Sequence, residues 1–138
     1  MVRTWFSFLI LFALTSCKDT NNPVYNKVPY VYVYEEIYLN SIEAQQLNLR
    51  DGAYTYHKGG VKGIIVYRVN AGKYLAFERF STATGQCQVR VDQSGFYILD
   101  TCTNTQFLWD GSTVRGVAPY PLKQYNVNKD NQRLIITN

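Results

Sequence analysis

The chain has 138 residues, enough for one domain, with 14 basic residues, 10 acidic residues and a net charge of +4. The bases are scattered singly and form no Lys/Arg stripe, which argues against nucleic-acid binding. The sequence holds one histidine and shows no Ser/His/Asp constellation, no glycine-rich phosphate loop and no pair of suitably spaced acids. We therefore expect a protein that is not an enzyme.

The first 16 residues have the pattern of a secretory signal peptide. Arg3 precedes an apolar run at 5–14, which at about ten residues is too short to span a bilayer. The run ends in Leu-Thr-Ser-Cys17, which resembles the lipobox of bacterial lipoproteins, in which the cysteine sulfur receives a diacylglycerol. The alternatives are an ordinary signal peptide with a chance cysteine, or a buried strand.

The lipobox resemblance implies that lipidated Cys17 attaches the protein to a membrane of the bacterial cell envelope. Lys18 directly after the cysteine favours the outer membrane over the inner one. Residues 18–27 are polar, contain a proline and show no periodicity, so we expect 17–27 to be a flexible tether. Cleavage removes one base, so the mature chain keeps 13 basic and 10 acidic residues, a net charge of +3.

The remaining residues, 28–138, have the pattern of a single all-β domain. Segment 41–50 favours a short helical turn or a long loop. Turn signals about every eight to twelve residues predict an antiparallel β-sandwich or small barrel of about nine to ten short strands. The segments rich in β-branched and aromatic residues are 28–39, 53–57, 63–70, 73–79, 88–92, 96–100, 123–128 and 132–137.

The first of these segments alternates valines with Tyr30, Tyr32 and Tyr34, which predicts one aliphatic face and one aromatic face. An exposed row of tyrosines could stack on sugar rings. The alternative is a strand between a core and a covering loop, because tyrosine suits the wet edges of sheets. The lone His57 follows a strand at a hairpin turn, and one histidine makes no metal site by itself, so we expect a surface or edge position.

From Lys73 onward the order of motifs resembles the Rieske iron–sulfur domain. A strand ending in Phe-Glu-Arg79 is followed by a loop with a cysteine, a hairpin, a second loop with a cysteine, Phe107 and an Asp-Gly turn at 110–111. The resemblance covers about 63–137 and implies a Rieske-like fold with a loop-rich cap subdomain at about 80–122. The so-called Pro loop of that family, which covers the cluster, is matched by Gly116, Ala118, Pro119, Pro121 and Leu122, with Val117 where proline is usual.

The resemblance also places four residues at the iron-ligand positions: Ser81 and Ala83 in the first loop, Asp100 and Thr103 in the second. A Rieske [2Fe–2S] cluster needs two thiolates on one iron and two imidazoles on the other. Serine and threonine hydroxyls keep their protons at neutral pH, alanine offers no donor, and one aspartate cannot hold a cluster. We therefore expect no cluster and no other bound metal.

Two further cysteines correspond to the disulfide of high-potential Rieske proteins. Cys102 matches the extra cysteine of the second loop, and Cys87 lies one residue beyond that of the first. The resemblance therefore implies a Cys87–Cys102 disulfide, which suits export to an oxidising compartment. Two alternatives stay open: an electron-transfer protein with a metal site of Cys87, Cys102, Asp100 and His57, and a sensor in which the two thiols cycle.

Taken together, the sequence favours a cluster-free Rieske-like lipoprotein with a binding or assembly role. Trp109, Tyr120 and Tyr125, with Phe107, are candidates for an exposed or half-exposed aromatic patch that contacts an envelope protein or a saccharide. The alternative is that Phe107 and Trp109 only fill the space between the loop and the base domain.

Overall fold

The computed structural model describes residues 28–138, so the predicted signal peptide, Cys17 and the tether lie outside the described residues. Within this part the chain forms ten strands and one short helix, which confirms the predicted all-β class. The helix is α1 (Gln45–Leu49). The strands are β1 (Tyr34–Tyr38), β2 (Tyr54–His57), β3 (Ile64–Asn70), β4 (Lys73–Glu78), β5 (Val89–Val91), β6 (Ile98–Asp100), β7 (Gln106–Phe107), β8 (Thr113–Arg115), β9 (Gln124–Asp130) and β10 (Arg133–Thr137).

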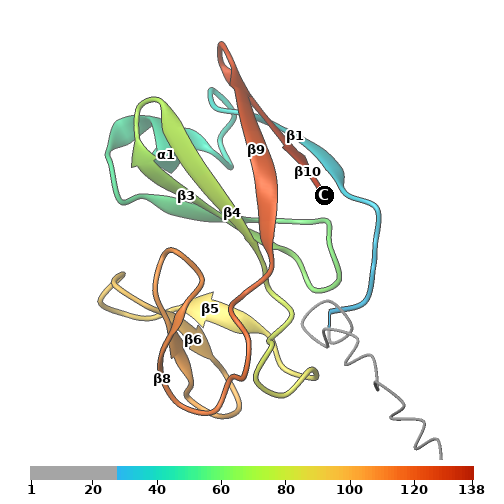
Figure 1. Cartoon of the computed structure of the whole chain (residues 1–138). Helices are drawn as coiled ribbons and strands as arrows, with labels where there is room; N and C mark the ends of the chain where they lie inside the picture. The colour runs from blue at the N-terminus through green and yellow to red at the C-terminus, as the bar shows by residue number, and fades with distance from the viewer. Residues whose placement is uncertain (1–27) are drawn as a thin grey trace, which may run out of the picture.

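These strands form two antiparallel sheets, which lie one above the other in Figure 1. The large sheet has the order β1-β10-β9-β4-β3-β2, and the small sheet has the order β5-β6-β7-β8. β4 and β9 are neighbours in the large sheet through Ala76↔Tyr125 and Phe77↔Gln124. The whole small sheet is therefore inserted in the sequence between two paired strands of the large one, inside the cap range predicted at 80–122.

Successive side chains of the central strands β3 and β4 point alternately into two hydrophobic cores. On β3, Ile64 and Val66 belong to the core of the large sheet, whereas Ile65 between them belongs to the core under the small sheet. On β4, Ala76 and Phe77 divide in the same way. Because side chains of a strand point alternately to its two faces, both faces of the central sheet are covered. This explains why the run of three apolar residues on β3 is fully buried.

The observed strands differ from the predicted ones at two places. The predicted strand 28–39 is paired only from Tyr34, because its partner β10 ends at Thr137. Beyond that point the Asn138 side chain takes over, accepting a hydrogen bond from Val33 N (2.6 Å) and donating one to Val31 O (3.1 Å). β7 and β8 were not predicted as strands.

The segment 41–50 forms one helical turn, α1, which was one of the two predicted alternatives. Leu47 is its buried residue. Among residues 28–138 no helix has the length and hydrophobicity needed to cross a membrane.

A buried carboxylate connects three segments of the chain at the end of β4. Glu78, the last residue of β4, is fully buried and accepts four hydrogen bonds. Oε2 accepts from Val61 N (2.7 Å) and the Tyr125 hydroxyl (2.6 Å), and Oε1 accepts from Lys62 N (2.9 Å) and Phe80 N (2.8 Å). One side chain thus joins the β2–β3 turn, β9 and the start of the first loop.

Candidate functional site: the two loops of the small sheet

The four predicted ligand positions lie on two loops that face each other. Ser81 and Ala83 belong to the loop between β4 and β5, which is closed by a bridge between Phe80 and Gln88. Asp100 ends β6 and Thr103 lies in the loop that follows. Ser81 and Asp100 are fully buried, whereas Thr103 is exposed. The two loops therefore come together as the resemblance implied.

Asp100 organises the second loop with one carboxylate oxygen. Its Oδ1 accepts hydrogen bonds from Cys102 N (2.7 Å), Thr103 N (2.7 Å) and the Thr103 hydroxyl (3.1 Å). Its Oδ2 is buried and has no hydrogen-bond partner. Burial alone would raise the pKa of Asp100, but the Ser81 hydroxyl and the loop donors favour the charged form, so the pKa of Asp100 is lowered. The buried carboxylate is therefore an anion, stabilised by donors of its own loop and by the Ser81 hydroxyl of the first loop.

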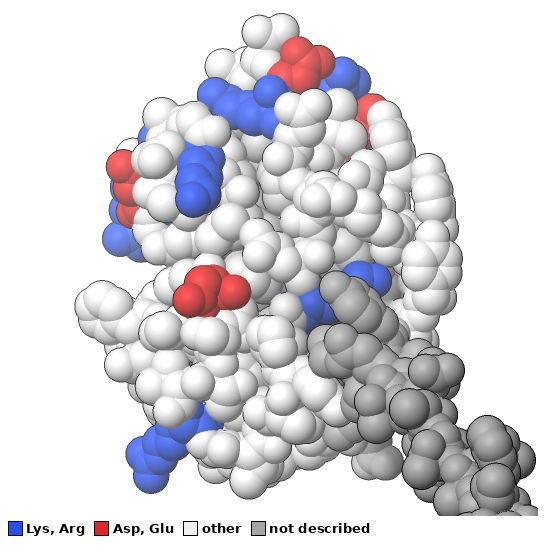
Figure 2. Space-filling view, in the orientation of Figure 1, with Lys and Arg blue, Asp and Glu red and all other residues white. Residues whose placement is uncertain are grey.

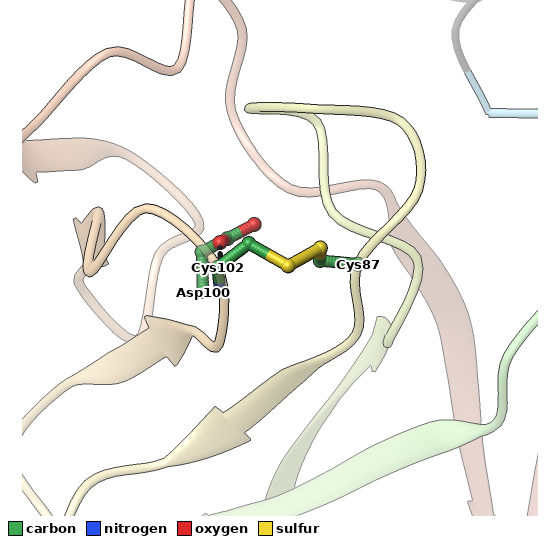
Figure 3. A group of neighbouring side chains, drawn as sticks. All are labelled: Cys87, Asp100 and Cys102. Atoms are coloured by element: carbon green, nitrogen blue, oxygen red, sulfur yellow. Dashed lines mark hydrogen bonds between the residues drawn. A yellow bond between two sulfur atoms is a disulfide. The ribbon is translucent and has the colours of Figure 1, made fainter.

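A disulfide joins Cys87 of the first loop to Cys102 of the second, with the two Cα atoms 6.1 Å apart, which confirms the implied pairing. Figure 3 shows the bond bridging the loops, with the Asp100 carboxylate beside it. The two sulfurs and a carboxylate oxygen of Asp100 all lie within 4.8 Å of one another. The disulfide that the resemblance implied therefore lies next to the buried Asp100 carboxylate.

These residues do not fit a Rieske cluster. The positions that should supply two thiolates and two imidazoles hold two hydroxyls, a methyl group and one carboxylate. Cys87 and Cys102 use their sulfurs on each other. His57 ends β2 at the edge of the large sheet, as expected, with Nε2 2.7 Å from the Thr55 hydroxyl, and burial lowers the pKa of His57. The structure does not bring His57 to the two cysteines and Asp100, so the four-residue metal site kept as an alternative is not assembled.

The Pro loop lies over both loops. The Thr82 hydroxyl of the first loop donates to Tyr120 O (2.8 Å), and Val117 N donates to the Thr105 hydroxyl of the second loop (3.2 Å). Gly116 has φ +108°, and a Cβ at this position would overlap the Thr105 side chain and backbone. Glycine is therefore needed at position 116, because only a residue without a Cβ lets the Pro loop approach Thr105 this closely. At the other end of the Pro loop, Leu122 is buried in the core under the small sheet. Ala118, which lies between Gly116 and Leu122, packs against the same core.

The predicted aromatic patch is not a single surface. Tyr125 is 3% exposed and hydrogen-bonded to Glu78, so the prediction that it is exposed was wrong. Phe107 is fully buried in the core under the small sheet, as its alternative reading held. Tyr120 is half-buried on the Pro loop. Trp109, also half-buried, stacks on Tyr67 of the large sheet, with ring centroids 3.9 Å apart and an interplanar angle of 11°.

Trp109 instead lines a groove between the two sheets that the sequence did not predict. The groove has a volume of about 340 Å³. The Trp109 indole N–H donates to Gly95 O (3.0 Å), which fixes the β5–β6 turn beside the ring. The lining includes the aromatic residues Tyr54, Tyr67, Phe96 and Trp109 and the polar residues Arg50, Asp51, Gln93 and Ser94. Residues from four separate segments meet here, so no local motif could have revealed it.

Two surface features bear on the other predictions. The tyrosines at the start of the domain face solvent: Tyr30 is 78% and Tyr32 is 74% exposed. Charged side chains on the face shown in Figure 2 occur singly or in small groups and form no continuous basic stripe.

No protein-family model and no curated protein matches the sequence. Solved structures do resemble it. The cyanobacterial plasma membrane Rieske protein PetC3 from Synechocystis PCC 6803 is 16% identical over 78% of this chain and 98% of its own, with a TM-score of 0.55. The ferredoxin of carbazole 1,9a-dioxygenase from Nocardioides aromaticivorans IC177 is 13% identical over 78% and 97%, with a TM-score of 0.50. At these identities the likeness concerns the fold, which is Rieske-like.

Proposed function

We propose that this chain is a lipid-anchored protein of the bacterial cell envelope that uses the Rieske-like fold as a binding module without an iron–sulfur cluster. The observation that supports it best is the state of the two loops. Asp100, the single ionised group at the ligand positions, is held by donors of its own loop, and both nearby cysteines are joined in a disulfide. The loops are thus connected by their own side chains.

The content of iron and acid-labile sulfide in freshly isolated protein tests the absence of a cluster. We expect both at background level and no visible absorption band, because the donor set that holds a Rieske cluster is missing. About two irons and two sulfides per chain with a visible spectrum would overturn the proposal. The isolation should include one preparation without oxygen, so that a labile cluster is not lost.

The groove beside Trp109 is the binding site that this proposal favours, with a saccharide as ligand. Its volume lies near the lower end of the roughly 300–1,000 Å³ typical of ligand pockets. Phe96 is 71% exposed at its rim and offers a free ring face, on which the apolar side of a sugar can stack. Arg50, Gln93 and Ser94 supply donors and acceptors for hydroxyl groups.

Replacing Phe96 with alanine should weaken binding to envelope saccharides by about 1–2 kcal/mol, because it removes a stacking ring without touching the core. Binding is measured on a saccharide array and then by calorimetry on the strongest hit. Val117→Ala is the matched control, since Val117 is 69% exposed on the Pro loop, away from the groove lining. Equal binding by the wild type and Phe96→Ala would remove the groove as the saccharide site.

The predicted anchor has a direct test. Cys17→Ser should move the protein from the membrane fraction to the soluble fraction of the envelope, because the lipidated sulfur is lost. Intact mass measurement of the wild-type protein should show the diacylglycerol addition on a chain beginning at Cys17. A wild-type chain of unmodified mass would refute the anchor, while leaving the fold and the groove unaffected.

A further inference from the structure

The two loops contain a second set of potential metal ligands that is hidden while the disulfide is intact. Two sulfurs and a carboxylate oxygen lie within 4.8 Å of one another, whereas three ligands of a tetrahedral zinc ion lie about 3.3–3.8 Å apart, given bond lengths of about 2.0–2.3 Å. The required movement is small once the sulfur–sulfur bond no longer fixes Cys87 and Cys102. Thiolate and carboxylate are both zinc ligands.

The second observation concerns Asp100. Its side chain is fully buried, yet Oδ2 has no hydrogen-bond partner. A buried polar atom without a partner is costly. In Figure 3 one carboxylate oxygen is turned toward the loop backbone and the other toward the space between the two loops, on the side of the disulfide. Oδ1 is the oxygen bonded to the loop backbone. The free oxygen is therefore the one that faces the space between the two loops.

From these two observations we infer that reduction of the Cys87–Cys102 disulfide creates a zinc site formed by both thiolates and Asp100. A dithiol reductant is oxidised to its disulfide and transfers two electrons and two protons, giving two thiols. Zinc then displaces both thiol protons. Cys102 is exposed and Cys87 half-buried, so a reductant can reach the bond. Water would take the fourth position, which is typical of sites with three protein ligands.

The site would keep the two loops connected in either redox state, by a disulfide when oxidised and by zinc when reduced. This inference concerns the reduced protein and does not depend on the proposed binding function. It also differs from a Rieske centre, because its sulfur ligands are the disulfide cysteines and not the residues at the iron-ligand positions. Thiolates and one carboxylate without histidine suit zinc, which needs no redox chemistry.

The test is zinc titration of the purified full chain in detergent, before and after reduction with a phosphine that is then removed without oxygen. We expect no zinc on the oxidised protein and about one zinc per chain on the reduced protein. Cobalt in place of zinc should give a thiolate-to-cobalt charge-transfer band, which reports directly on sulfur ligation. Binding to the oxidised protein at the same affinity, or none to the reduced protein, would overturn the inference.

Variants separate a built site from thiols that bind zinc in an unfolded chain. Asp100→Asn keeps an oxygen that accepts from the loop amides and replaces the free anionic oxygen. The zinc affinity of the reduced protein should therefore fall at least about 10- to 100-fold, because mutation of residues that only support a metal ligand already has an effect of this size. Asp110→Asn is the matched control, because Asp110 also bonds its own loop, through Ser112, but lies outside the cluster. Unchanged affinity in Asp100→Asn would mean adventitious thiol binding and would refute the site.

Discussion

Replacing Glu78 with alanine should lower the free energy of unfolding by about 4 kcal/mol or more, a large share of the roughly 5–15 kcal/mol that stabilises a domain. The change removes one acceptor from each of four donors: three backbone amides and the Tyr125 hydroxyl. Each donor left unpaired in a buried position costs about 1–3 kcal/mol, and entry of water recovers part of that. Denaturation in urea, followed by circular dichroism, measures the loss.

The neighbouring residues give this prediction its controls. Tyr125→Phe removes only one of the four donors and should cost about 1–2 kcal/mol. Because Tyr125 and Glu78 are in contact, the double variant should be less destabilised than the sum of the two single variants. Glu43→Ala changes an exposed glutamate and should have little effect. A loss below about 1 kcal/mol in Glu78→Ala would show that the hydrogen bonds of Glu78 to the β2–β3 turn, β9 and the first loop do not stabilise the fold.

Residue patterns within short segments predicted most of the strands, and they failed where a contact joins distant segments. The alternating valines and tyrosines, the apolar run on β3 and the turn residues are all readable locally. The sequence shows Glu78 only as the acidic member of a motif, because three of its four partners lie 16 to 47 residues away. For the same reason Tyr125 was expected to be exposed or half-exposed, although its ring belongs to the core of the large sheet and its hydroxyl binds Glu78.

The candidate site was predictable to a similar degree. Resemblance gave the two loops, the Pro loop and the cysteine pairing, because sequence order fixes which loops face each other in a known fold. The resemblance could not show which hydrogen bonds each polar atom makes. That Asp100 uses one oxygen on its own loop and leaves the other without a partner depends on side-chain orientation. The stacking of Trp109 on Tyr67 likewise arises only when the two sheets pack together.

The second large effect is expected for the disulfide. A Cys87→Ser/Cys102→Ser double variant should lose about 3 kcal/mol of stability, because the bond closes a loop of 15 residues and so restricts the unfolded chain. In the native state the cross-link joins the two loops at one end of the small sheet, where Thr101 also donates hydrogen bonds to Gln88 O. The loss should therefore be largest for the small sheet, and hydrogen exchange of amides in 80–105 should rise more than exchange on β3.

Reduction of the wild-type protein in a zinc-free buffer is the natural control, since it breaks the same bond without changing either side chain to serine. It should reproduce the double variant within about 1 kcal/mol. Acid should weaken the second loop further in both forms. The lowered pKa of Asp100 means that its stabilisation is present above the unfolded pKa of about 3.9 and is lost as pH falls through the lower folded value. If the double variant unfolded at the same urea concentration as the wild type, the hydrogen bonds of Asp100, Thr101 and the Pro loop would be sufficient to hold the two loops.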